Sequence, residues 1–174
     1  AAERDVYFHT DAVQAVGKIP IDVRALPLYA LSLSAHKFHG PKGIGALYLN
    51  RNARFQPLLH GGGQESERRS GTENVPAIVG MGVAAERSFE SLEASARIVE
   101  LRDRFEQGIL ASVEGVEING AVDRRLPNTS NLFLPGVDGE GLLILLDEAG
   151  VCCSPGSACS TGAVQPSRIV RAMG

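Results

Sequence analysis

Several features are missing or scarce in this sequence, and each absence excludes a class of protein. The 174 residues carry a formal net charge of −3 without a basic tract, so the electrostatic footprint of a nucleic-acid-binding protein is lacking. No apolar run reaches the roughly 18 residues of a membrane span, and the first residues do not resemble a targeting peptide. The expectation is a cytoplasmic protein without a nucleic-acid or membrane partner.

Cysteine is also rare, with three residues that all lie in the segment VCCSPGSACSTG. An odd count in one short segment does not suit a disulfide framework. The adjacent Cys152 and Cys153 cannot easily turn toward one metal ion, and Cys-x-x-Cys is absent, so no intrinsic metal site is expected. Because they lie in GVCCS, which has the pattern of a short strand, both are predicted to be small core residues.

What the sequence does contain is an alternation of strand and helix patterns, and 44% of its residues are hydrophobic, enough for a real core. This alternation predicts an α/β protein. Strands are expected at residues 6–13, 28–35, 44–49, 115–120 and 129–136, with the second and third antiparallel. Helices are expected at 11–19, at two stretches within 76–105, at 139–150 and from 166 onward. The polar, glycine-rich residues 60–75 are predicted to form a long loop.

The organisation along the chain changes near residues 90–94. We expect residues 1–92 to belong to a larger, strand-rich domain and residues 93–174 to a smaller α+β domain. Both ends look cut, since the chain begins almost directly in a strand pattern and stops soon after a helix begins. The sequence is therefore interpreted as a piece of a longer chain.

Lys37 stands between two histidines at a strand end, in SAHKFHGPKG. Such a lysine is most often a solvated surface charge, and the glycines after it could simply form a hairpin turn. However, neighbouring positive charges lower the pKa of a lysine, which then condenses with aldehydes. Ser34 and the backbone amides of the turn could bind a phosphate beside it. Pyridoxal phosphate is both an aldehyde and a phosphate ester.

A pyridoxal-phosphate enzyme also needs a carboxylate against the pyridine nitrogen. Asp11 ends its own predicted strand, and a crossover between parallel strands would bring it to the sheet edge that carries Lys37. Asp11 alone could equally cap a helix. From the residues, both readings of Asp11 and of Lys37 stay open.

Four motifs in order resemble one known family: FHTDAVQAVGKIPID, SAHKFHGPKGIGALYL, HGGGQESERRSGTENV and SPGSACSTG followed by PSRIVRAMG. They are similar to the cysteine desulfurases, which are fold-type I pyridoxal-phosphate enzymes of the aminotransferase class V group. The branch most resembled serves nitrogenase and general iron–sulfur cluster assembly. The resemblance covers almost the whole chain and implies the end of a large-domain sheet followed by a smaller α+β domain.

The resemblance implies roles for particular residues. Lys37 resembles the lysine that binds pyridoxal phosphate covalently, Asp11 the partner of the pyridine nitrogen, and Gln14 the partner of the phenolic oxygen. Ser34 and His36 resemble phosphate ligands, with Ala35 between them where relatives more often carry glycine. The remaining implied residue of the cofactor site is Thr72, which resembles a threonine that reaches the phosphate of a neighbouring subunit in a homodimer. His9 and His39 could serve the site or only pack locally.

Cys159 lies among small, flexible residues, unlike a structural cysteine on an apolar face. From the residues alone it could be an exposed, unreactive thiol. The resemblance implies that it takes sulfur from L-cysteine as a persulfide, leaves L-alanine, and passes the sulfur to an iron–sulfur scaffold or another acceptor protein. Cys159 could then also be a ligand of an iron–sulfur cluster while that cluster is transferred.

Arg171 resembles the clamp for the substrate carboxylate, although it could only cap or solvate a helix. Arg168 stands where many relatives have an aromatic residue, so its role is open. The family's chain is about twice as long, and the missing half resembles a source of further cofactor contacts, so the fragment alone is expected to be inactive. Three alternatives are a selenocysteine lyase, a class V aminotransferase, and an inactive module for dimerisation or partner binding.

Overall fold

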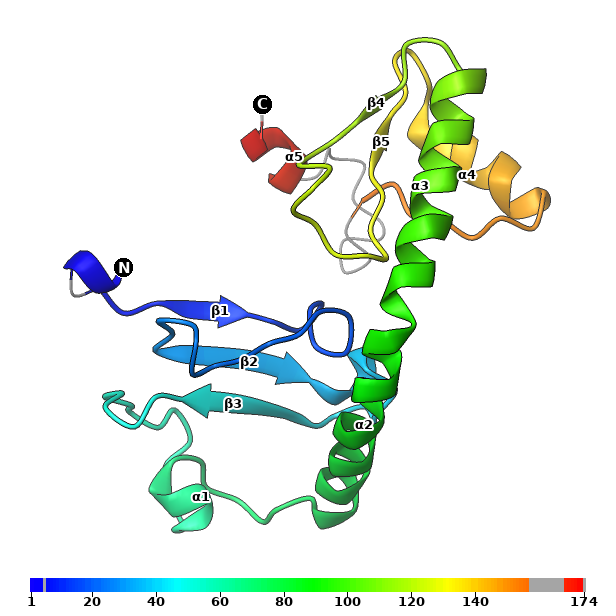
Figure 1. Ribbon diagram of the computed structural model, residues 1–174. Coiled ribbons are helices and arrows are strands. Elements are labelled where there is room, and N and C mark those ends of the chain that lie inside the picture. The colour runs from blue at the N-terminus through cyan, green and yellow to red at the C-terminus, as the bar shows by residue number, and fades with distance from the viewer. Residues whose placement is uncertain (5, 157–167, 174) are drawn as a thin grey trace. The chain divides into compact units, whose positions relative to one another are not determined.

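The computed structural model describes residues 1–4, 6–156 and 168–173 (Figure 1). The chain divides into two compact units. Unit 1 consists of Ala1–Val99 and Leu126–Asn128, and unit 2 consists of Glu100–Arg125 and Thr129–Gly174. In the part of the chain that the structure describes, no helix is long and apolar enough to cross a membrane.

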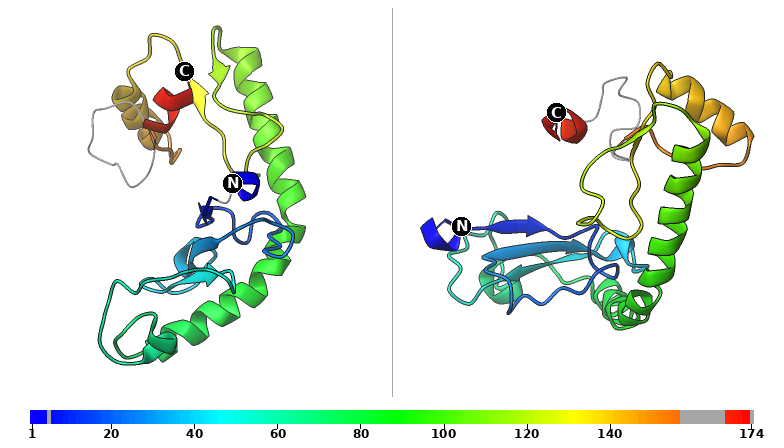
Figure 2. Two further views of the ribbon diagram at one scale, coloured as in Figure 1. Left: turned by 90° about the vertical axis from the view of Figure 1, so that its left-hand side faces the viewer. Right: turned by 45° about the horizontal axis from the view of Figure 1, so that its top comes forward.

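Unit 1 is built on a three-stranded sheet whose strands lie side by side in each view of Figures 1 and 2. The strands, in the spatial order β1-β2-β3, are β1 His9–Asp11, β2 Ala30–Ser34 and β3 Gly45–Leu49. β1 pairs with β2 in parallel, and β2 pairs with β3 antiparallel. The antiparallel pair is therefore confirmed, whereas the first strand is shorter than its sequence pattern indicates.

The predicted helix over residues 11–19 is wrong, because this stretch forms successive turns. The amides of Ala15 and Val16 donate to the carbonyl of Ala12, at 2.9 and 3.2 Å, and those of Lys18 and Ile19 donate to the carbonyl of Ala15, at 3.0 and 3.2 Å. Within these turns Gly17 adopts a left-handed conformation with φ of +75°, and Pro20 follows them. A left-handed residue inside the turns and a proline after them prevent a regular helix from propagating.

Two long helices follow the loop, as predicted within residues 76–105. The first, α2, spans Val75–Glu93, and the second, α3, spans Ser95–Ser112 and so extends beyond the predicted end. Asn74 caps α2 by accepting a hydrogen bond from the Ala77 amide at 3.3 Å. The remaining short helices of unit 1 are η1 Ala2–Arg4, η2 Ala35–Lys37 and α1 Gln64–Glu67. α1 contains left-handed residues, so the stretch 60–75 is largely the irregular loop expected.

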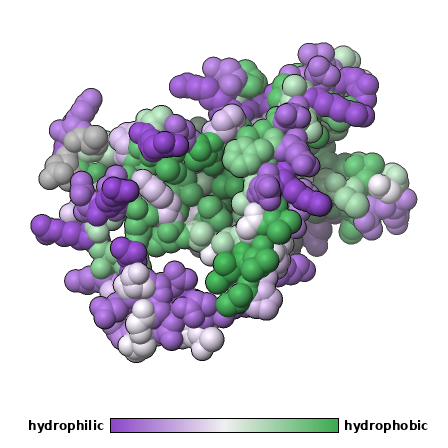
Figure 3. All heavy atoms as spheres, turned by 60° about the horizontal axis from the view of Figure 1, so that its bottom comes forward, coloured by the Kyte–Doolittle hydropathy of each residue, from purple (hydrophilic) through white to green (hydrophobic). Residues whose placement is uncertain are grey.

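The buried apolar residues of unit 1 form two clusters. One centres on Ala12, Leu28 and Leu31 beside β1 and β2. The other joins η2 to α2 through Ala35, Phe38 and Ala84. Apolar side chains are also exposed, and Figure 3 shows them interspersed with polar residues on one face of the molecule. The second cluster positions the turn that carries Lys37.

Unit 2 combines helices with a short two-stranded ladder in its described part. A two-stranded antiparallel ladder joins β4 Glu117–Ile118 to β5 Leu132–Phe133, at the two places where strands are predicted. The helices are α4 Gly139–Glu148 and α5 Arg168–Met173, along with the last turns of α3. Asp138 caps α4 by accepting from the Gly141 amide at 2.8 Å, and Gly150 ends it with φ of +78°.

The segment after α4 corrects two predictions. Residues 151–154 form no strand, and Cys152 and Cys153 are exposed rather than part of the core. The amides of Gly150 and Val151 turn back to the carbonyls of Asp147 and Leu146, at 2.9 and 2.8 Å. The chain thus reverses at the end of α4 and places the cysteines beside the helix, and within the described residues they belong to no strand.

A buried ion pair holds unit 2. The side chain of Glu106 on α3 is 5% exposed and that of Arg125 is 12% exposed. The two Arg125 terminal nitrogens donate to the two carboxylate oxygens of Glu106, and the Nη1–Oε1 distance is 2.6 Å. Arg102 and Asp103 extend the cluster through contacts at 2.7 and 2.9 Å. Hydrogen bonding to Arg125 holds the pKa of Glu106 below its usual value against the opposing effect of desolvation.

Candidate functional site

The parallel pairing of β1 and β2 places the ends of both strands at one edge of the sheet (Figure 1). Asp11 is the last residue of β1 and pairs in register with Ser32, while Ser34 ends β2. η2 follows immediately and ends at Lys37. The carboxyl end of a parallel pair is where open α/β sheets hold ligands, so this edge is the candidate site.

Lys37 lies on a turn that is fixed on both sides. Ala35 is fully buried, Phe38 is 4% exposed, and Lys37 between them is half-buried. The amides of Phe38 and Gly40 donate to the Ala35 carbonyl at 3.1 and 2.9 Å. The Ala35 amide donates to the carbonyl of Ile44 at 3.1 Å. These bonds and the buried neighbours fix the backbone that carries the amine.

α2 closes over the same turn at close range. A Cβ atom at Gly80 would lie 2.6 Å from Cγ of Pro41, and one at Gly40 would lie 2.9 Å from Cβ of Ala35 within the turn and 3.2 Å from Cβ of Ala84 on α2. Distances below 3.0 Å require a shift of the neighbouring atoms. Glycine at these two positions therefore lets the helix and the lysine turn approach each other.

The other predicted residues of this edge occur in local hydrogen-bonded groups. The Ser34 hydroxyl contacts His36 Nδ1 at 2.8 Å, so the structure brings these two predicted ligands together. The Asp11 carboxylate accepts a hydrogen bond from the Val13 amide at 2.9 Å and opens the first turn of the crossover. His9 Nε2 contacts the Ser32 hydroxyl at 2.7 Å, which is a local role for this histidine.

Gln14 is exposed on the crossover and is joined to a residue that the sequence did not single out. The ammonium of Lys18 donates to the Gln14 carbonyl at 2.8 Å and contacts its side-chain oxygen at 3.5 Å. Burial lowers the pKa of Lys18, and the nearby positive charge of Lys37 lowers it further. The spacing of four residues from Gln14 is the sequence signal that could have found Lys18.

The remaining predicted residues lie in other segments of the chain. Thr72 is exposed in the loop before α2, and within the described residues no hydrogen bond links it to the Lys37 turn. Arg171 is exposed on α5 in unit 2, and Arg168 begins the same helix. Cys159 lies outside the described residues.

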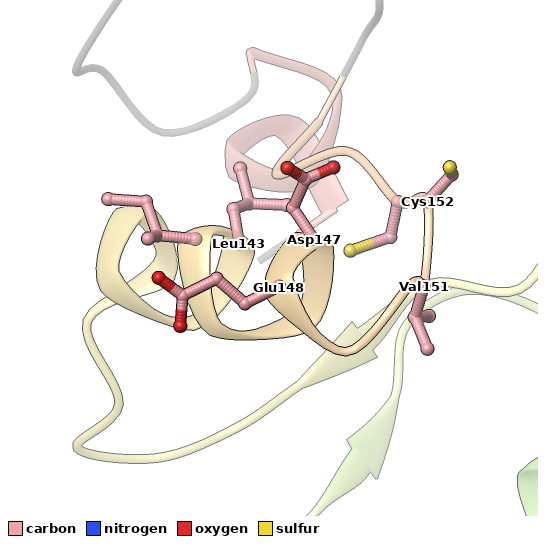
Figure 4. A pocket seen from close by; sticks show the side chains of 7 residues that line it. Leu143, Asp147, Glu148, Val151 and Cys152 are labelled. Atoms are coloured by element: carbon pink, nitrogen blue, oxygen red, sulfur yellow. The ribbon is translucent and has the colours of Figure 1, made fainter.

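The exposed cysteines of unit 2 line an open cavity of about 490 Å³. Figure 4 shows that α4 contributes Leu143, Asp147 and Glu148 to its lining, and the segment after α4 contributes Val151 and Cys152. Among the residues that the structure describes, no group of three or more histidine, cysteine or acidic side chains could hold a metal ion. This cavity therefore offers thiols and carboxylates without a metal centre.

The sheet edge, with its amine, carboxylate and hydroxyl groups, is consistent with the family that the sequence matches. Residues 1–173 match the aminotransferase class-V family, and the chain belongs to this family. Its architecture is that of the fold-type I pyridoxal-phosphate-dependent transferases, as predicted from the motifs.

Relatives extend this likeness over the chain. It is 52% identical over 173 residues to a cysteine desulfurase of Trichormus azollae, a match that covers 99% of this chain and 43% of that protein. It is 50% identical over 174 residues to the cysteine desulfurase NifS of Azotobacter vinelandii, again covering 99% of this chain and 43% of the relative. The chain thus spans less than half the length of these curated relatives.

A solved structure described as SspA in complex with cysteine is similar to this chain with a TM-score of 0.74. The two are 40% identical, and the match covers 99% of this chain and 47% of the other. The resemblance to cysteine desulfurases found in the sequence motifs is confirmed by these relatives.

Proposed function

We propose that this chain is the cofactor-anchoring and sulfur-accepting part of a cysteine desulfurase. The reaction converts L-cysteine and the Cys159 thiol into L-alanine and a Cys159 persulfide. One observation carries the proposal: β1 and β2 pair in parallel, so Asp11 and the turn of Lys37 share one sheet edge. Identity of about half to curated cysteine desulfurases over nearly the whole chain supports it.

The groups at this edge fit pyridoxal phosphate as the cofactor. Lys37 supplies an amine for the aldehyde, and Asp11 supplies a carboxylate for the pyridine nitrogen. The hydroxyl of Ser34 and the ring of His36, held together at 2.8 Å, are suited to a phosphate, along with the backbone of Ala35. When bound, this cofactor withdraws electrons from the α-carbon of the substrate, so that the bond to sulfur can break.

The residues of the chain have separate tasks in this reaction. The Lys37 amine would anchor the cofactor and would move a proton at the α-carbon of the substrate. Arg171 holds the substrate carboxylate through its forked guanidinium group. The Cys159 thiolate attacks the substrate sulfur and keeps it as a persulfide.

We assign the two parts of the chain to two domains of the parent protein. Residues 1–92 are the end of the cofactor-binding domain, and residues 93–174 are the domain that carries Cys159. In a homodimer, Thr72 reaches the cofactor phosphate of the neighbouring subunit. The persulfide supplies an iron–sulfur scaffold or another acceptor protein in the cytoplasm.

The test uses the complete protein with pyridoxal phosphate, L-cysteine and a reductant. We expect alanine and sulfide in equal amounts from the wild type, and sulfide release near background from Cys159→Ser, since serine cannot hold a persulfide. Both products are quantified during steady turnover.

The matched control is Cys153→Ser, which makes the same change six residues earlier, at an exposed position. It should release sulfide like the wild type. Near-normal sulfide from Cys159→Ser would contradict the proposal and would favour a lyase-type cleavage, in which sulfide leaves without a protein thiol.

A further inference from the structure

Lys18 is anchored at both its backbone and its side chain. The hydroxyl of Ser95, at the start of α3, donates to the Lys18 carbonyl at 3.0 Å. The ammonium of Lys18 donates to the backbone carbonyl of Gln14 at 2.8 Å. All three residues belong to unit 1. The ammonium of Lys18 is therefore held beside Gln14 rather than extended into solvent.

The surroundings of Lys18 contain further positive charge and little else that titrates. Lys18 lines a cavity of about 280 Å³ together with His39, and the other lining residues carry no ionisable side chain. Those residues are Gly17, Ser91, Ala94, Ser95, Ile98, Pro127 and Asn128. The charge of Lys37 is close enough to act on Lys18. No carboxylate lines this cavity.

The contact with Gln14 has a chemical consequence for its amide group. Lys18 Nζ lies 3.5 Å from Oε1 of Gln14, so the amide oxygen faces a cation. A lysine ammonium can only donate, and an amide in this orientation presents its NH₂ group on the other side. The free side of Gln14 is therefore a hydrogen-bond donor.

We propose that Lys18 is a positioning residue that orients the Gln14 amide as a donor toward the phenolic oxygen of the cofactor. The inference rests on the proposed function, because Gln14 acts on pyridoxal phosphate only if this edge binds it. A donor to the phenolic oxygen favours the unprotonated form of the Lys37–cofactor linkage over the protonated form.

The experiment follows the visible absorption of the complete, cofactor-saturated protein across a pH titration. We expect Lys18→Met to raise the pH midpoint of the titration by roughly half a unit, because the Gln14 amide is no longer oriented as a donor to the phenolic oxygen. Lys18→Arg keeps the charge and the donor, and its midpoint should stay near that of the wild type. Arg24→Met is the matched control, since it removes a positive charge from a side chain that is 93% exposed.

A double-mutant comparison tests whether Lys18 acts through Gln14. In a Gln14→Leu background, the shift caused by Lys18→Met should be smaller than in the wild type, because the oriented amide is already gone. An equal shift in both backgrounds would overturn the positioning role.

Two further outcomes separate this inference from the function on which it rests. A Lys18→Met protein with bound cofactor and an unchanged midpoint, or a Lys18→Arg protein shifted as far as Lys18→Met, would overturn the inference and leave the function intact. A wild-type protein without any visible band that depends on Lys37, judged against Lys37→Ala, would overturn both.

Discussion

The two units of the chain bury different kinds of side chain. In unit 1 the buried clusters are apolar and surround the turn of Lys37, with Leu31 and Phe38 at 3% and 4% exposure. In the described part of unit 2, the buried residues are Val116 and Glu106, and the carboxylate of Glu106 is paired with Arg125. One unit is held by packing and the other by a charge pair.

This difference fits the tasks proposed for the two units. A catalytic amine must be held within fractions of an ångström, which close packing and a fixed backbone provide. A buried ion pair fixes geometry but contributes less net stability than apolar contacts of similar size, because two charges must leave water. Unit 2 is accordingly the part that we expect to respond more strongly to pH.

The largest expected effect comes from breaking the packing of unit 1. Phe38→Ala should destabilise the folded chain by about 4 kcal/mol, since it removes a nearly fully buried ring beside Lys37. Urea unfolding followed by circular dichroism measures this loss. Phe89→Ala removes the same atoms from a side chain that is 71% exposed and should cost far less. Equal losses from the two variants would contradict the packing argument.

The next effect comes from breaking the charge pair of unit 2. Glu106→Ala should destabilise this unit by about 3 kcal/mol, because it leaves the Arg125 cation buried without its partner. Faster amide hydrogen exchange in β4, β5 and the end of α3 would show this loss of stability. Arg124→Ala, at a side chain that is 86% exposed, is the control and should leave exchange unchanged.

The smallest expected effect is a pH dependence confined to the same pair. The folded state lowers the pKa of Glu106, so its contribution to stability is present above the ordinary value of 4.5 and is lost as pH falls through the lower folded value. Amide hydrogen exchange in unit 2 should therefore accelerate in that acid range. The increase should be small, because the protonated carboxyl group of Glu106 keeps part of its contact with Arg125. Glu106→Gln should remove this dependence, whereas an unaltered acid profile would show that other groups cause it.

Regular, local features of this chain could be predicted from the sequence. The alternation of residues 28–35 and 44–49 predicts the antiparallel pair, and the two helical patterns within 76–105 predict α2 and α3. Asp11 and Lys37 were expected at one sheet edge, and the parallel pairing of β1 and β2 places the ends of their strands there. The roles of these two residues remain predictions.

Features that depend on tertiary context could not be predicted in this way. The helix expected over 11–19 is interrupted at the left-handed Gly17, where an added Cβ atom would lie 3.3 Å from the Cβ atoms of Phe38 and Ser88, residues far away in sequence. Cys152 and Cys153 carry a strand-like pattern but, within the described residues, belong to no strand. Glu106 and Arg125 are 19 residues apart and show no periodic relation, so their pairing follows only from the fold.

The close approach of Gly80 to Pro41 has a consequence for how this protein can change during evolution. Most exposed positions of α2 can be exchanged freely, but any larger residue at position 80 must be matched by a change in the turn after Lys37. A position with no chemical group of its own thereby shares the selective constraint of the amine that we propose as the cofactor anchor.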